Sequence, residues 1–112
     1  MDRYIQRTVL IDISSSTTVS ESTDISGYRV VGVQIPASWT AGNITFQVDP
    51  NGAGTFYAVD KLDGNALTLT DPGASNIGLI DDTYFLVGKA IKAVAASAQA
   101  GDRTLVLLCV AL

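Results

Sequence analysis

Short runs of β-forming residues, separated by turn residues, dominate this sequence. Val, Ile, Thr and Tyr recur in brief segments, and Gly, Asp, Asn, Pro and Ser stand between them. No long window repeats apolar residues at i, i+3 and i+4, which is the pattern of an amphipathic helix. This texture is typical of β-sandwiches and barrels. The prediction is an all-β fold, a single antiparallel β-sandwich with jelly-roll-like connectivity and about eight or nine short strands.

Period-2 alternation gives the strands their predicted faces. In the segment 44–48, Ile44, Phe46 and Val48 are expected to point inward. In 28–35, Val31, Val33 and Ile35 are expected to share one face, and Tyr28, Val30 and Gln34 the other. The segment 103–110 is apolar on both faces, as expected for a central strand. Segment 90–95 fits a strand or one helical turn. The predicted strands are 7–13, 17–24, 28–35, 44–48, 55–59, 66–70, 77–80, 84–87 and 103–110, with 90–95 left open.

Length and composition favour one domain that assembles with something else. The 112 residues form a single predicted domain, 1–112, in which residues 1–6 are a possible N-terminal arm. Charged residues make up 16% of the chain, against ~25% in average globular proteins, while 47% are hydrophobic. The remaining surface is rich in Ser, Thr, Ala and Gly. Such a neutral surface is easily desolvated against a partner.

Charge and segment length argue against several classes of partner. The net charge is −4, and the seven Lys and Arg residues form no basic run. We therefore expect no nucleic acid and no membrane as partner, since both need clustered positive charge or long apolar segments. The start Met1-Asp2-Arg3-Tyr4 leads into no apolar stretch, so no secretory signal is expected.

The residue types for common catalytic sites are missing. The chain has no histidine, and its single cysteine, Cys109, lies in an apolar run that predicts a buried thiol. Asp81-Asp82 is interpreted as a solvated turn rather than a catalytic pair. The alternative of a Ca²⁺ site rests on oxygen ligands in neighbouring loops, namely Asp49, Asn51, Asp60, Asp63 and Asn65. We expect no enzyme activity, no catalytic residue, no metal and no cofactor.

One long segment resembles small structural proteins of tailed bacteriophages. Residues 31–59 read VGVQIPASWTAGNITFQVDPNGAGTFYAV, in which an apolar strand ends in IPA-W and is followed by NITFQV, a Gly-rich turn and TFY. The run Arg103-Thr104-Leu105-Val106-Leu107 and the N-terminal DISGYRV fit the same pattern. The likeness covers most of the chain and is one of texture and short motifs.

The resemblance implies a non-enzymatic virion protein. Members of this class include capsid decoration (cement) proteins, which bind the assembled head shell and stabilise it. The implied partner is the major capsid protein, and the implied state is a homo-oligomer, a trimer. The implied location is the virion, on the phage head surface, after synthesis in the cytoplasm of the bacterial host. Alternatives are a head-fibre or tail component, or a carbohydrate-binding adhesin module.

Four residues are candidate interface positions. Tyr4 lies in the possible arm, and Thr18 and Ser20 lie in a polar segment, 17–24, that fits an edge or an interface. Trp39 sits in the loop 36–43, where an exposed ring can anchor a partner or stack on a sugar. The preferred interpretation of Trp39 is instead a cap on one end of the core.

Overall fold

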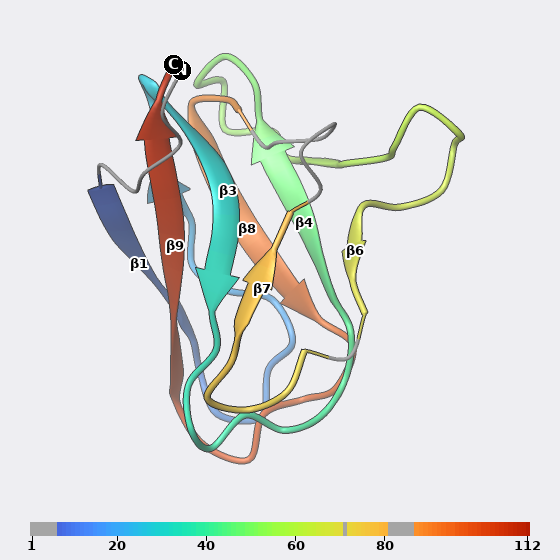
Figure 1. Ribbon diagram of the computed structural model, residues 1–112. Coiled ribbons are helices and arrows are strands. Elements are labelled where there is room, and N and C mark those ends of the chain that lie inside the picture. The colour runs from blue at the N-terminus through green and yellow to red at the C-terminus, as the bar shows by residue number, and fades with distance from the viewer. Residues whose placement is uncertain (1–6, 71, 81–86) are drawn as a thin grey trace.

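The computed structural model describes residues 7–70, 72–80 and 87–112, and these form two antiparallel sheets facing each other. Figure 1 views the sandwich with its strands running vertically. Tyr4, the possible arm 1–6, the Asp81-Asp82 pair and most of the predicted strand 84–87 lie outside the described residues. The all-β prediction is confirmed.

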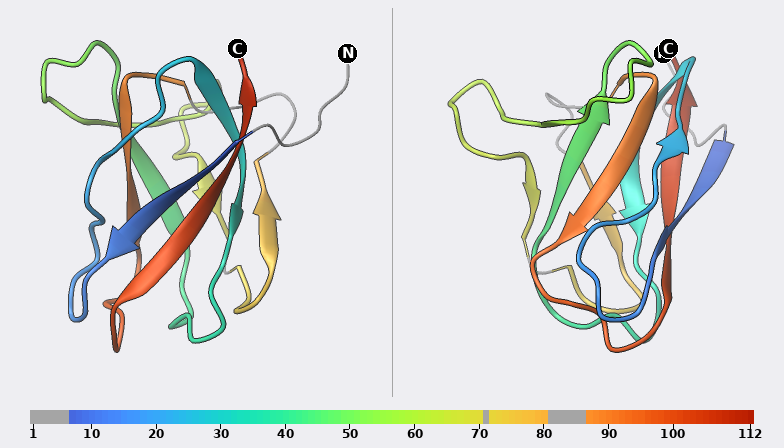
Figure 2. Two further views of the ribbon diagram at one scale, coloured as in Figure 1. Left: turned by 90° about the vertical axis from the view of Figure 1, so that its left-hand side faces the viewer. Right: turned by 180° about the vertical axis from the view of Figure 1, so that it is seen from behind.

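Sheet A contains four strands, two of which, drawn in blue and red, lie in front in the left panel of Figure 2. Their order is β1 (Arg7–Ile13), β9 (Arg103–Ala111), β3 (Tyr28–Gln34) and β7 (Ile77–Leu79). β9 is therefore a central strand, as its two apolar faces predicted. β1 and β7 are the edges of the sheet.

Sheet B has the order β2 (Thr23–Asp24), β8 (Ala90–Ala95), β4 (Ile44–Asp49) and β5 (Tyr57–Ala58). The short strand β6 (Thr68–Leu69) pairs with the first residues of β4, while β5 pairs with its last residues. β5 and β6 thus divide one strand position between them. Segment 90–95 is a strand and not a helical turn.

The strand order is that of a jelly roll. Successive strands lie in alternating sheets, except that β4, β5 and β6 all belong to sheet B. When β5 and β6 are counted as one position, the described part of the chain has eight strands. The first strand, β1, pairs with the last, β9; β9 also pairs with the third, β3; and the second, β2, pairs with the last but one, β8. This is the arrangement of two Greek keys wound together, so the jelly-roll connectivity follows from the pairings.

Alternate residues of the long strands fill the space between the sheets. Val9, Ile11 and Ile13 of β1 are buried, as are Ile44 and Phe46 of β4. β9 contributes Leu105, Leu107 and Cys109, each fully buried. These inward positions follow directly from the period of two, because successive strand side chains point to opposite faces.

A β-bulge in β3 overturns one predicted face. The pairing of β3 with β9 shifts between Val30 and Gly32, so Val31 is an extra residue. Val30, Val33 and Ile35 consequently point inward and are at most 1% exposed, whereas Val31 is half-buried. The prediction that Val31 shares a face with Val33 was wrong, because one inserted residue reverses the alternation.

Candidate assembly surface

The outer face of sheet A carries a row of apolar side chains. The register places Leu10 of β1 opposite Val106 of β9, and Leu108 of β9 opposite Gly32 of β3. Gly32 in turn lies opposite Leu79 of β7. These positions alternate with the inward core residues, so their side chains project from the sandwich. We call Leu10, Ile77, Leu79, Val106 and Leu108 the apolar face.

Three members of the apolar face are largely open to solvent. Leu79 is 72% exposed, Leu10 62% and Ile77 58%, whereas Leu108 is only 8% exposed. Gly32 explains part of this contrast. A Cβ at Gly32 would stand 3.2 Å from Leu79 Cδ2 and 3.4 Å from Leu108 Cδ1, so the two leucines meet above the glycine. The result is a largely apolar surface, interrupted by the exposed Gln34 between Val106 and Ile77. Apolar surfaces of this kind mark interaction sites.

Polar groups border the apolar face at one end of β1 and β9. Asp12 lies opposite Thr104, and the Thr104 hydroxyl donates a hydrogen bond of 2.7 Å to Asp12 Oδ1. Both residues are exposed. An apolar centre with a polar border is the usual anatomy of a protein interface.

Trp39 belongs to the core and not to the surface. Its side chain is 7% exposed and packs with the buried residues of the sandwich. Its indole Nε1 is buried and has no hydrogen-bond partner among the described residues. The interpretation of Trp39 as a core cap is confirmed, and the ring is not presented to a partner or a sugar in this conformation.

The polar segment 17–24 forms the edge of sheet B. Val19 bridges to Val94, and Thr23 and Asp24 pair with β8. Ser20 is 5% exposed because its Oγ accepts the Ala93 N–H at 2.8 Å. The edge position was predicted correctly, but Ser20 is buried within the chain and offers no contact surface. Thr18 is half-buried, and its carbonyl accepts the Ala95 N–H.

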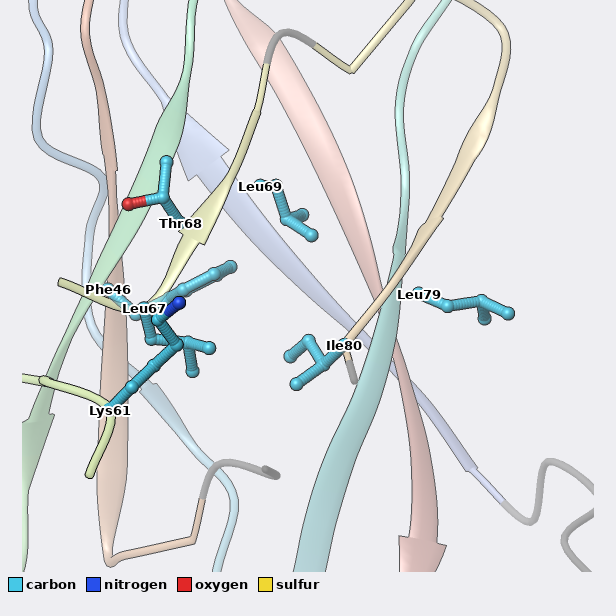
Figure 3. A pocket seen from close by; sticks show the side chains of 7 residues that line it. All are labelled: Phe46, Lys61, Leu67, Thr68, Leu69, Leu79 and Ile80. Carbon is cyan, nitrogen blue, oxygen red and sulfur yellow. The ribbon is translucent and has the colours of Figure 1, made fainter. Parts of the chain in front are cut away.

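A pocket of about 230 Å³ opens between β6 and β7, where the two sheets separate (Figure 3). Phe46, Leu67, Leu69 and Ile80 supply apolar walls, and Thr68 and Lys61 are the polar side chains among the described lining residues. The Leu79 side chain points away from the other labelled residues. The Lys61 ammonium lies 3.6 Å from Asp63 Oδ2. Among the described residues that line the pocket, Lys61 therefore has its ammonium close to a carboxylate of its own loop.

The loop carboxylate of Asp49 organises its own turn. Asp49 Oδ1 accepts the Gly52 N–H at 3.0 Å, and Oδ2 accepts the Gly54 N–H at 2.9 Å. Burial raises the pKa of this carboxyl, but the N–H donors of Gly54, Asn51 and Gly52 lower it by more. The resulting pKa is below the usual value of 3.8. These oxygens are already engaged by the backbone. Among residues 7–70, 72–80 and 87–112, no group of three metal-ligating side chains comes together.

Cys109 lies on the inner face of β9. It is fully buried, and this burial raises the pKa of its thiol above 9.0. A buried neutral thiol is unreactive, as the apolar sequence around it predicted.

Comparisons with known proteins leave the chain without an assigned relative: no protein-family model, curated protein or solved structure matches it. Among the described residues, there is no helix that is long and apolar enough to cross a membrane.

The sequence reasoning did not identify the apolar face. Two signals bear on it: Leu10 stands at an outward position of an alternating strand, and segment 103–110 is apolar on both faces. The missing information was which strands lie beside each other. Only the pairing of β7 with β3 brings Leu79 next to Leu108.

Proposed function

We propose that this chain is a non-enzymatic structural protein of a bacteriophage virion, a capsid decoration protein that binds the assembled head shell and stabilises it. The observation that carries the proposal is the apolar face of sheet A. The resemblance of residues 31–59 to virion proteins supplies the class of partner. The major capsid protein is the proposed partner on the phage head.

The apolar face suits repeated attachment to a lattice. Burying exposed apolar area contributes roughly 25 cal/mol per Å². Each contact is modest, but a shell presents many equivalent sites, and many small interfaces add up over the particle. A regular sheet with an apolar centre and a polar border supplies such a contact without any change of fold.

The chemistry of the side chains agrees with a binding role. The sequence contains no histidine to act as a base near neutral pH. The thiol of Cys109 is enclosed in the core. A carbohydrate-binding module is less well supported, because its central requirement was an exposed Trp39 and that ring is 7% exposed.

Copy number tests the proposal and its closest rival. Quantitative mass spectrometry of purified virions would measure this chain against the major capsid protein. A ratio within a few-fold of one supports a place on the shell lattice. A handful of copies per particle would favour a head-fibre or tail component instead, and complete absence would end the virion hypothesis.

A leucine substitution tests the apolar face itself. Leu79→Ser removes an exposed apolar side chain from the face, and we expect it to weaken binding to shells lacking the protein. Full burial of a leucine is worth roughly 1.5–3 kcal/mol, so the dissociation constant should rise about tenfold or more. The matched control is Leu62→Ser, because Leu62 is 93% exposed and lies off sheet A. Equal binding by both variants would exclude the face as the attachment surface.

A further inference from the structure

We propose that β1 of one chain pairs antiparallel with β1 of a second copy, with Thr8 of each opposite Leu10 of the other. This pairing would join the two A sheets into one continuous eight-stranded sheet. The inference concerns the isolated protein and does not rest on the proposed virion role.

The outer edge of β1 carries backbone groups that no described strand uses. β1 pairs with β9 along one side only. The Asp12 carbonyl accepts the Glu21 N–H at 3.0 Å, so the backbone of Asp12 points away from β9. Backbone direction alternates along a strand. Thr8 and Leu10 therefore also direct their N–H and C=O groups outward, into the space beside the sheet.

The Glu21 contact selects the register of pairing. A register that places Leu10 opposite Leu10 would also place Thr8 opposite Asp12. The Asp12 carbonyl already accepts the N–H of Glu21. Shifting by one pair places Thr8 opposite Leu10 and Leu10 opposite Thr8. Two such pairs, each exchanging two bonds, give four hydrogen bonds. Strand residues 7–11 of each chain then overlap, and none of these residues lies opposite the other chain's Asp12.

A second copy fits this edge because the edge is complementary to itself. In the selected register Arg7 lies opposite Ile11, so no like charges face each other across the pair. Leu10 of each chain becomes a diagonal neighbour of Leu10 of the partner subunit, within reach of a side-chain contact. That contact would cover part of a side chain that is 62% exposed. The strand RTVLIDI contains no proline, and its two charged residues lie at the end of the overlap (Arg7) or beyond it (Asp12).

The pairing predicts a dimer and not a trimer. Each chain has one β1 edge, so pairing of β1 with β1 closes at two copies. The overlap is short compared with interfaces that bury 1,200–2,000 Å², so the dimer should form in a concentration-dependent way. The trimer implied by the sequence resemblance would need a different surface.

Oligomer mass on the purified protein tests the inference. Light scattering behind size exclusion should approach twice 11.7 kDa, about 23 kDa, as concentration rises. Leu10→Lys places a charge at the pairing edge, and we expect it to stay at the mass of one chain. Leu62→Lys is the control and should dimerise like the unchanged protein. A single-chain mass at the highest concentration reached, a trimer, or equal dimerisation of both variants would overturn the inference.

Cysteine cross-linking tests the register. A Thr8→Cys chain mixed with a Leu10→Cys chain should oxidise to a mixed disulfide dimer, because hydrogen-bonded neighbours stand about 5.5 Å apart at Cα. The native Cys109 is fully buried and should not interfere. Faster cross-linking of Leu10→Cys with itself than in the mixture would overturn the proposed register. Virion copy number is unaffected by either result, so failure here and failure of the proposed function are distinguishable.

Discussion

Gln99 joins three loops that are far apart in the sequence. Its side-chain Oε1 accepts the Thr40 N–H at 2.9 Å, and its Nε2 donates to the Ser97 carbonyl at 3.0 Å. Its own carbonyl accepts the Ser16 N–H at 2.8 Å. Gln99 is 1% exposed. Its side chain therefore takes the place of water as the hydrogen-bond partner of two partly buried backbone groups, the Thr40 N–H and the Ser97 carbonyl.

Gln99→Ala should therefore destabilise the fold. The Thr40 N–H would lose its acceptor while staying partly buried, which costs about 1–3 kcal/mol. Urea unfolding measures this as a lower midpoint with an unchanged slope. Gln34→Ala is the control, because Gln34 is exposed on the outer face of β3. A loss no greater than that of the control would contradict the role given to Gln99.

Asp49 should make the stability of the protein depend on acidity. Its pKa in the folded chain is below 3.8, because backbone N–H donors outweigh the opposing effect of burial. A folded-state pKa below the unfolded value stabilises the fold above the unfolded pKa, and this contribution is lost as pH falls through the folded pKa.

The comparison of Asp49→Ala with the unchanged protein isolates this contribution. The variant should be less stable at pH 6, and the difference in unfolding free energy should shrink as pH drops below about 4. Asp24 and Asp63 also have lowered pKa values, but they are present in both proteins and cancel in the difference. A difference that stays constant down to pH 2 would contradict the ionic role of the Asp49 carboxylate.

At the scale of the strand, β3 and β7 approach each other closely at Gly32, beside the bulge of β3. A Cβ there would lie 3.2 Å from the Gly78 carbonyl oxygen and 3.2 Å from Leu79 Cδ2. The sequence indicated that a neighbour approaches Gly32, and the structure identifies that neighbour as β7. A side chain at Gly32 therefore requires its neighbours to shift by a few tenths of an ångström.

Gly32→Val should consequently force β7 away from β3. Overpacking of this kind costs about 1–3 kcal/mol. Thermal unfolding gives the size of the loss, and Gln34→Val is the matched control on the same face of the same strand. If Gly32→Val is as stable as that control, the close approach is not a constraint.

Strand positions were predictable where the alternation of side chains is regular. The prediction for 7–13 coincides with β1, and 44–48 differs from β4 by one residue. β3 was found, but its bulge was not, because the sequence around Val31 is apolar at four neighbouring positions and fits either phase. The predicted strands 55–59 and 66–70 shorten to two residues each, since both pair with parts of the same edge of β4.

At the scale of the whole molecule, the order of the strands decides which surface is exposed. Alternation along one strand says which side chains share a face, but it does not say which strands are neighbours. The predicted interface residues came from local cues, and two of them, Trp39 and Ser20, are buried. The apolar face emerges only when β1, β9, β3 and β7 are placed side by side.

The position of β9 has a consequence for how the chain is made. β9 is the last strand along the sequence, yet it lies between β1 and β3, the first and third. A ribosome delivers β9 after all the other described strands, so β1 and β3 lack their common neighbour until the segments before β9 have been synthesised. Sheet A, with its outward leucines, therefore completes only after β9 has been synthesised, as a slow closure between distant segments. The apolar face therefore forms only after the strands that support it have been synthesised.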